Sequence, residues 1–542
     1  MTRLFKFAGG VHPPDHKADS TRLAIAQPSL PPRLFVPLHQ HIGNHAKPVV
    51  QAGDVVRAGQ TIGEAQGRIS VAVHAPCAGT VLAVTQALMP HPSGLVDLCI
   101  EIEPDGSTLA VEPRPLDWRK APRDEVFAHL RAMGIAGLGG AVFPTYAKLL
   151  GAARELAILV INGAECEPFI TCDDLLMREH AGEVIAGAQI LAELLPARRI
   201  VVGIEDNKPE ALAAMRAAAQ ATGGGVEVIA VPTIYPGGGA KQLIRVLTGI
   251  EVPSGQRSTE LGVQCFNVAT ARSVWRALVS GEALTHRVIT IAGNVREPRN
   301  YDAPLGTPIA HLLGLAGELP DTTGYIMGGP MMGFDLPRPD VPVVKASNCV
   351  IAKSSRLFPP PAPAMPCIRC TRCVVACPAE LSPHELHWFA KSRNFGKAQE
   401  YALFDCIECG ACAYVCPSHI PLVSYFRFAK SEIWAREREK NAADEARTRH
   451  EARSARLERE KLDRAEKLAA KTASAAPAVM PEPEPSPPAD DAAHTAIARA
   501  RAQKELAKQS LAALDPAALG GEALETQRTR LKELAEQKHE HG

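Results

Sequence analysis

The chain has 542 residues, 46% of them hydrophobic, and its 59 lysine and arginine residues balance 59 aspartate and glutamate residues. This length allows several domains. A net charge of zero argues against nucleic acid as a main partner, because phosphate binding needs a basic surplus. No apolar run is long enough to span a membrane, and the start, MTRLFKF, does not resemble a signal peptide. We therefore expect a cytosolic protein that reaches any membrane only through partners.

Residues 1–115 are rich in Gly, Pro and Val, and the stretch 49–84 contains short β-type runs separated by turn residues. This pattern predicts a β domain at the start of the chain.

From 116 to 250 the pattern changes to alternating strands and helices. Strands are predicted at 156–161, 200–204 and 226–231, and helices at 174–195 and 208–222. Alternation of this kind predicts a parallel, Rossmann-like α/β sheet, which binds ligands at the carboxyl ends of its strands.

Residues 251–350 predict a smaller α+β unit with a strand at 287–293 and a helix after Pro308. The Pro-rich stretch 358–363 is a stiff linker into a cysteine-rich region at 356–430. The segment 431–542 is dominated by Ala, Glu, Lys and Arg, and no aromatic residue follows Trp434. This composition predicts solvated helix or disorder. An amphipathic helix that binds a membrane or a partner is the less favoured alternative, because charge surrounds the helix on all sides instead of leaving one apolar face.

Eight of the fourteen cysteines form the pattern C-x2-C-x2-C-x3-C-P, which begins at Cys367 and is repeated from Cys406. Three closely spaced thiolates can hold three corners of an iron–sulfur cubane, and the fourth cysteine ligates the other cluster. Structural zinc instead favours two C-x2-C pairs separated by a longer loop. The repeat therefore predicts two [4Fe-4S] clusters, one held by Cys367, Cys370, Cys373 and Cys416 and the other by Cys377, Cys406, Cys409 and Cys412. Such clusters pass single electrons, so a hydride donor would also require a flavin.

Three loops could bind a flavin and its nucleotide substrate. The Gly-rich segment 137–145 would let a ring or phosphate approach the backbone, although an ordinary tight turn has the same composition. The segment 162–174 follows a predicted strand and carries acids and an amide suited to ribityl hydroxyls, although acids also favour a helix start. The loop 235–241 opens a helix whose amides could meet dinucleotide phosphates. The candidate cofactor-binding residues are Gly137, Gly139, Gly140, Phe143, Thr145, Lys148, Asn162, Glu165, Glu167, Asp173, Gly238 and Lys241.

Together these motifs resemble the C subunit of the Rnf/Rsx ion-translocating electron transport complex, whose middle region is similar to the flavoprotein subunit of respiratory complex I. The resemblance covers about residues 1–430. It implies that GLGGAVFPT-x2-K and NGAECEP-x4-DD contact FMN and that YPGGGAKQLI lies near NADH. The segments GDVVRAGQ and APCAGTV resemble a barrel-sandwich fold that lacks the lysine needed to carry biotin or lipoate, which suggests a docking module. The segment from VQCFNVATA to RVITIAGNV resembles a β-grasp domain of the soluble-ligand-binding type.

The resemblance implies a peripheral electron-input subunit on the cytoplasmic side of the bacterial inner membrane. It would pass electrons between NADH, FMN and two [4Fe-4S] clusters, to or from membrane-embedded and peripheral subunits that move ions. It identifies no catalytic side chain. Two alternatives remain: a diaphorase-type subunit of a soluble hydrogenase or formate dehydrogenase, and a ferredoxin-like relay without flavin.

Overall fold

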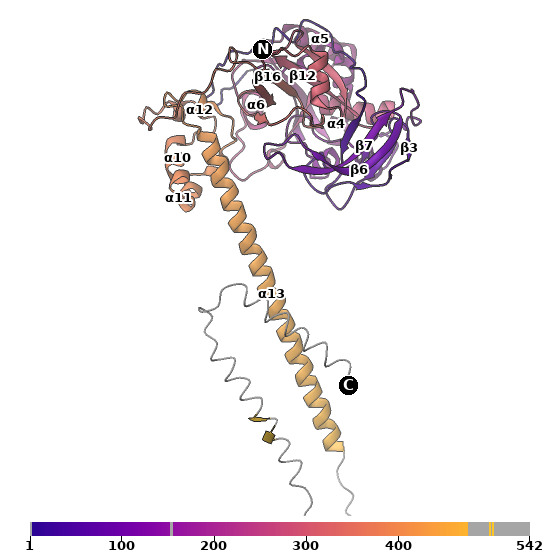
Figure 1. Ribbon diagram of the computed structural model, residues 1–542, viewed down its shortest axis with the longest axis vertical. Helices are drawn as coiled ribbons and strands as arrows, with labels where there is room; N and C mark the ends of the chain where they lie inside the picture. The colour runs from indigo at the N-terminus through magenta and orange to yellow at the C-terminus, as the bar shows by residue number, and fades with distance from the viewer. Residues whose placement is uncertain (1–2, 152–155, 475–497, 500, 503–542) are drawn as a thin grey trace, which may run out of the picture. The chain divides into compact units, whose positions relative to one another are not determined.

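The computed structural model describes residues 3–151, 156–474, 498–499 and 501–502 (Figure 1). The chain divides into two compact units, Met1–Ala443 and Asp444–Gly542. In the described part of the chain, no helix is both long enough and apolar enough to cross a membrane.

The N-terminal β domain consists of two antiparallel sheets. The first has the order β1-β7-β6-β3, formed by Leu34–Pro37, Val96–Pro104, Gly79–Leu88 and Val55–Val56. The second joins β2 (Lys47–Pro48), β4 (Thr61–Glu64) and β5 (Val73–His74). Alternate residues such as Ile100 and Ile102 face inward and are fully buried, because side chains along a strand point to opposite faces.

The chain before β1 packs against other regions of the same unit. Phe5 N donates to Val246 O at 2.9 Å, Val11 pairs with Tyr235, and Ala26 pairs with Tyr301. This N-terminal segment (residues 3–26) therefore borders both the α/β region and the α+β region.

The α/β region is built on a parallel sheet with the order β10-β9-β8-β11. Its strands are Val226–Val231, Ala197–Glu205, Leu156–Gly163 and Val263–Asn267. Its helices are α1 (Arg123–Ala132), α2 (Thr145–Leu150), α3 (Cys172–Glu179), α4 (Ala181–Leu194), α5 (Pro209–Ala221), α6 (Ala240–Thr248) and α7 (Val268–Trp275). The parallel sheet and its three predicted strands are confirmed.

Two details of this region differ from prediction. The helix predicted at 174–195 is two helices that meet at His180. The domain boundary predicted at residue 250 is too early, because β11 pairs with β8 and adds residues up to 267 to the sheet. A five-residue strand with mixed polarity, VQCFN, does not show from sequence which sheet it will join.

The α+β region has a five-stranded sheet with the order β13-β12-β16-β14-β15. These strands are Arg299–Pro304, His286–Gly293, Cys349–Lys353, Gly324–Met327 and Phe334–Leu336. Helix α8 (Ile309–Leu315) shares one apolar core with this sheet, in which Ile289, Ile291, Leu312 and Leu313 are fully buried. The predicted strand and the helix after Pro308 are confirmed.

The cysteine region is helical, with α9 (Arg372–Val375), α10 (Pro383–Lys391), α11 (Phe395–Glu400), α12 (Ala411–Tyr414) and the long α13 (Leu422–Ser474). Figure 1 shows α10 and α11 beside the first turns of α13. There, Leu422, Phe426, Ala429 and Ile433 form a buried stripe at helical spacing. In the second unit, the described side chains of α13 are mostly exposed. Most of the predicted tail after Ser474 lies outside the described residues.

The close packing of α4 on α7 can be tested at a glycine. A Cβ at Gly187 would lie 1.9 Å from Ala271 O, whereas a Cβ at Gly182 on the same helix would meet no atom within 4 Å. We expect Gly187→Ala to lower the free energy of unfolding by about 1–3 kcal/mol, because the helices must separate. Gly182→Ala should leave it unchanged or raise it by up to about 1 kcal/mol through helix propensity. Urea unfolding compares the two variants, and equal effects would contradict this account.

Candidate functional site

The eight motif cysteines line two separate cavities. The inner cysteine set, defined as Cys377, Cys406, Cys409 and Cys412, surrounds one cavity whose other lining includes Leu381, Leu386 and Phe426. The outer cysteine set, defined as Cys367, Cys370, Cys373 and Cys416, surrounds the other. All fourteen cysteines lie within the described residues and none forms a disulfide. The structure thus groups the thiols in the interleaved sets that the sequence predicts as cluster ligands.

The two halves of the repeat have the same backbone path. Arg369 and Glu408 both adopt positive φ, at 54° and 57°, and so do Glu380 and His419, at 53° and 50°. The amide of Arg369 donates to Cys367 Sγ and that of Glu408 donates to Cys406 Sγ, each at 3.4 Å. Left-handed conformations are costly for residues other than glycine, so their occurrence at equivalent positions indicates that both halves require the same loop shape around their thiols.

Burial and mutual repulsion oppose ionisation of the inner thiols. Burial raises the pKa of Cys409 to about 11 and also raises that of Cys412, and neighbouring cysteines add to both shifts. Four thiolates can share such a cavity only if a cation is bound among them, and the metal then displaces the protons. Thiolate sulfur is also the usual ligand of iron–sulfur clusters, so the donor set fits the predicted group.

The second part of the site lies at the carboxyl edge, the edge of the β10-β9-β8-β11 sheet where its strands end. The Asn162 Nδ2 atom donates to Gly238 O at 2.8 Å, which joins two of the predicted cofactor loops. The Glu165 carboxylate accepts from the amides of Asp173 and Asp174 at 2.6 and 3.2 Å, and so caps α3.

Glu167 and Asp173 complete the acidic part of this edge. The Glu167 carboxylate accepts from the amides of Met331 and Met332 at 3.2 and 2.7 Å, which ties the edge to the α+β region. Asp173 Oδ2 accepts from Asn267 Nδ2 at 2.6 Å. The structure therefore brings the predicted acidic and amide residues together, and it engages Glu165 and Glu167 in contacts within the protein.

The Gly-rich loop closes on itself through the amide of Gly137, which donates to Phe143 O at 2.9 Å. Gly139 and Gly140 are exposed, and a Cβ at Gly140, whose φ is +102°, would meet no atom within 4 Å. A ligand could therefore approach the backbone closely at this point. Thr145 is buried, and its hydroxyl has no hydrogen-bond partner among the described residues.

The two predicted lysines are turned toward the protein. Lys148 Nζ donates to Cys265 O and lies 4.4 Å from the centre of the Phe266 ring, and burial lowers its pKa. Lys241 Nζ contacts Val252 O and Pro253 O at 3.5 and 3.3 Å. In this conformation neither ammonium group is free for a phosphate.

Unpaired acceptors at the carboxyl edge fit a ligand rich in hydroxyl groups. Asp173 Oδ1 and Glu205 Oε1 are buried and have no hydrogen-bond partner among the described residues. An unpaired buried acceptor is costly, and the hydroxyls of a ribityl chain or a ribose would supply donors. These residues thus fit the sugar part of FMN or of a nicotinamide dinucleotide.

Four residues of the edge were not predicted from the sequence: Lys17, Glu205, Lys208 and Asn267. Lys208 Nζ donates to Glu205 Oε2 at 2.7 Å, and both side chains are buried. The polar run 205–208 follows a predicted strand just as 162–174 does, so its place after that strand is a sequence signal for these residues. Lys17 lies 148 to 153 residues from its partners, and no local pattern marks it.

Glu167 gives the site a testable pH dependence. Burial raises its pKa to about 7, so between roughly pH 4.5 and 7 the folded chain binds more protons than the unfolded chain. The stability that depends on neutral Glu167 is therefore lost as the pH rises through 7. We expect the stability of the wild-type chain relative to Glu167→Gln to fall by about 1–2 kcal/mol from pH 5 to pH 8.

Melting temperatures across this pH range measure the effect. The exposed control Glu112→Gln should follow the wild-type chain. A constant difference between wild type and Glu167→Gln would show that this carboxyl group does not titrate in the range.

Four family models match consecutive parts of the chain. They are the RnfC barrel sandwich hybrid domain (residues 5–107), the Nuo51 FMN-binding domain (130–276), the SLBB domain (288–335) and the 4Fe-4S dicluster domain (366–420). These matches confirm the predicted barrel-sandwich, FMN-binding and ferredoxin-type domains.

The chain is 46% identical over 465 residues to the C subunit of the ion-translocating oxidoreductase complex of Pectobacterium carotovorum, covering 85% of this chain and 62% of that protein. It is 45% identical over 510 residues to the protein of the same name from Citrobacter koseri, covering 94% of this chain and 71% of that protein. The chain therefore spans less than two thirds of the length of the first relative. The air-oxidized NAD+-reducing [NiFe]-hydrogenase aligns with a TM-score of 0.42 and 18% identity, over 58% of this chain and 61% of that one. The matched domains and the two relatives show that the chain belongs to the family of C subunits of ion-translocating oxidoreductase complexes.

Proposed function

We propose that this chain is the electron-input subunit of an ion-translocating oxidoreductase, taking electrons from NADH at the carboxyl edge and passing them through two [4Fe-4S] clusters. The match to an FMN-binding domain and to a 4Fe-4S dicluster domain supports the cofactors, and the names of the relatives support the reaction. Ion movement and attachment to the cytoplasmic face of the inner membrane belong, in this proposal, to partner subunits.

The observation that carries the proposal is a direct contact between the carboxyl edge and the inner cysteine set. The Tyr235 hydroxyl, from the loop after β10, donates to Cys409 O at 2.5 Å in a buried position. Val11, Ala376 and Ala411 pack around this hydrogen bond in one apolar cluster. We call this cluster the relay contact. Continuous packing of this kind gives electrons a short path through protein atoms.

The relay contact suggests an order for the two clusters. The inner set receives electrons first, because Cys409 touches the carboxyl edge. The outer set lies nearer the surface, since Cys370 is exposed and the apolar side chains of Ile368 and Val375 are 68% and 76% exposed. Apolar groups around an exposed cluster ligand suit a protein partner that accepts the electrons.

Bound FMN would supply the conversion between a two-electron donor and one-electron clusters, which cubanes cannot perform alone. Gly139 and Gly140 would admit it, and Asp173 and Glu205 would accept from its hydroxyls. The N-terminus of α6 has Gly239 as its N-cap and no side-chain cap, so its amides are available for the phosphates of NADH.

The flavin site can be tested with Asp173→Asn. This change preserves side-chain volume but removes the charged acceptor, and we expect the affinity for FMN to fall about 10-fold. NADH-driven ferricyanide reduction should fall with FMN content, while iron per chain stays constant. The exposed control Asp105→Asn should match the wild type. A fully iron-loaded wild-type chain with no FMN and no NADH oxidation would contradict the proposal and favour the flavin-free relay.

The order of the clusters can be tested by removing one ligand from each set. In Cys409→Ala, we expect NADH to reduce the outer cluster at least about 10-fold more slowly, because the relay contact no longer leads to a cluster. In Cys370→Ala, the inner cluster should be reduced at the wild-type rate. Rapid-freeze EPR measures both rates, and iron analysis checks that one cluster remains. Unimpaired reduction of the outer cluster in Cys409→Ala would refute the order.

A further inference from the structure

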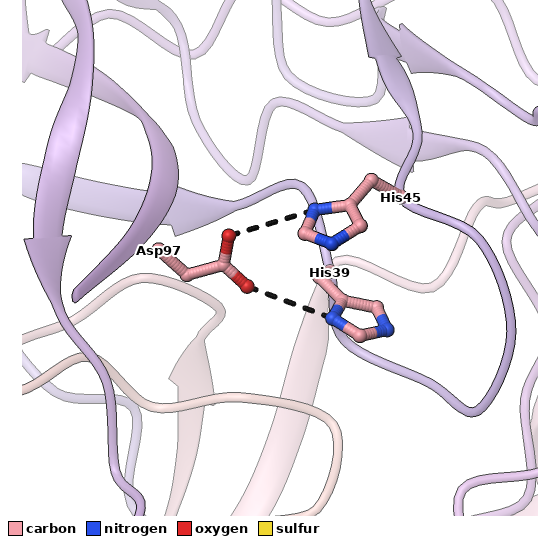
Figure 2. A group of neighbouring side chains, drawn as sticks. All are labelled: His39, His45 and Asp97. Atoms are coloured by element: carbon pink, nitrogen blue, oxygen red, sulfur yellow. Dashed lines mark ion pairs between the residues drawn. The ribbon is translucent and has the colours of Figure 1, made fainter. Parts of the chain in front are cut away.

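Three side chains of types that can ligate metals, His39, His45 and Asp97, converge on the surface of the N-terminal β domain (Figure 2). His39 and His45 come from the loop that follows β1, and Asp97 lies near the start of β7. The Nδ1 atoms of the two histidines each lie 3.5 Å from a different oxygen of the Asp97 carboxylate. One ligand atom from each residue can be chosen so that all three lie within 4.8 Å of one another.

From this geometry we propose that His39, His45 and Asp97 bind a divalent transition-metal ion of the zinc type. The site lies in a different domain from the cysteine sets and the carboxyl edge, so the proposal goes beyond electron transfer. Two imidazoles and one carboxylate are a common zinc donor set that leaves a position open for water or another ligand.

The two distances lie within ion-pair range, but they fit a bridging metal ion better than two direct hydrogen bonds. A good N–H···O hydrogen bond spans about 2.7–3.2 Å, which is shorter than either Nδ1–carboxylate distance here. Two ligand atoms that are each about 2.1 Å from a tetrahedral zinc ion lie about 3.4 Å apart. The rings of His39 and His45 are stacked 4.2 Å apart, so both nitrogens reach the carboxylate from the same side.

The backbone holds the three residues in place. The loop that carries His39 and His45 is closed at its ends by the Ala46 amide, which donates to Leu38 O at 2.9 Å. The Leu38 amide donates to Leu98 O at 3.0 Å, which joins this loop to the strand that carries Asp97. Asp97 Oδ1 accepts from the Leu98 amide at 2.7 Å, which orients the carboxylate. A preorganised site of this kind loses little conformational entropy when an ion binds.

The site is also open to solvent. The side chains of His39, His45 and Asp97 are 34%, 52% and 27% exposed. An ion can therefore enter without unfolding the domain, and water can complete its coordination.

The test uses the full chain with both clusters loaded under anaerobic conditions and equilibrium dialysis against ZnCl2. Zinc and iron per chain are measured by mass spectrometry in the wild type, His45→Asn, Asp97→Asn and the control His91→Asn. His91 is an exposed histidine of the same domain whose ring bonds to Ser93 instead of to Asp97. Any zinc bound by cysteines contributes equally to all four proteins.

We expect the wild type and His91→Asn to bind about one more zinc ion per chain than His45→Asn and Asp97→Asn, with equal iron in all four. Zinc should also raise the melting temperature of the wild type and of His91→Asn, but not that of the other two variants, since an ion bound to the folded state stabilises it. Excess Mg2+, which prefers oxygen ligands, should not displace the zinc. Equal zinc content and equal melting shifts in all four proteins would overturn the proposal.

Discussion

A single buried ammonium group holds the loop on which the candidate site depends. Lys17 Nζ donates to the carbonyl oxygens of Glu165, Glu167 and Ile170 at 2.8, 2.8 and 2.5 Å. The loop between β8 and α3 would otherwise direct three carbonyls into the protein without donors, which is costly. It also contains two residues with positive φ, Glu165 at 53° and Phe169 at 67°. The Lys17 bonds offset this backbone strain, and they tie the N-terminal segment to the carboxyl edge.

The two glutamates of this loop connect it in two directions. Glu165 caps α3 within the α/β region, whereas Glu167 holds the amides of Met331 and Met332 in the α+β region. Met331 in turn packs so closely on the cysteine region that a Cβ at Gly410 would lie 2.6 Å from its carbonyl oxygen. The position of the inner cysteine set relative to the carboxyl edge is therefore fixed from two sides, by Met331 in the loop between β14 and β15 and by Tyr235. A path for electrons requires this constraint, since a loose joint would lengthen the gap that they cross.

The sequence predicted those parts of the site that depend on local pattern. The cysteine spacing predicted two sets of thiols because a cubane requires ligands at fixed intervals, and the apolar runs predicted β8, β9 and β10 because buried parallel strands need them. It could not predict Lys17, whose three acceptors are distant in sequence, or the orientation of Lys148 toward β11. Strand β11 was missed for the same reason, since the strand with which it pairs in the described part of the chain, β8, is distant in sequence. Contacts that tertiary packing alone creates leave no periodic signal.

The two cysteine sets lie in different environments, and this asymmetry bears on the proposed order of the clusters. Cys377, Cys409 and Cys412 of the inner set are buried, whereas Cys370 of the outer set is exposed. Adding an electron to a cluster adds negative charge, which burial disfavours and water stabilises. Lys430 partly offsets this burial, because its ammonium group donates to Cys406 O at 2.7 Å. At the outer set, the exposed arginines Arg369 and Arg372 stabilise added negative charge, and so does the surrounding water. On balance the outer cluster should take the electron more readily, which agrees with the order of clusters proposed above, from the carboxyl edge to the inner set and then to the outer set.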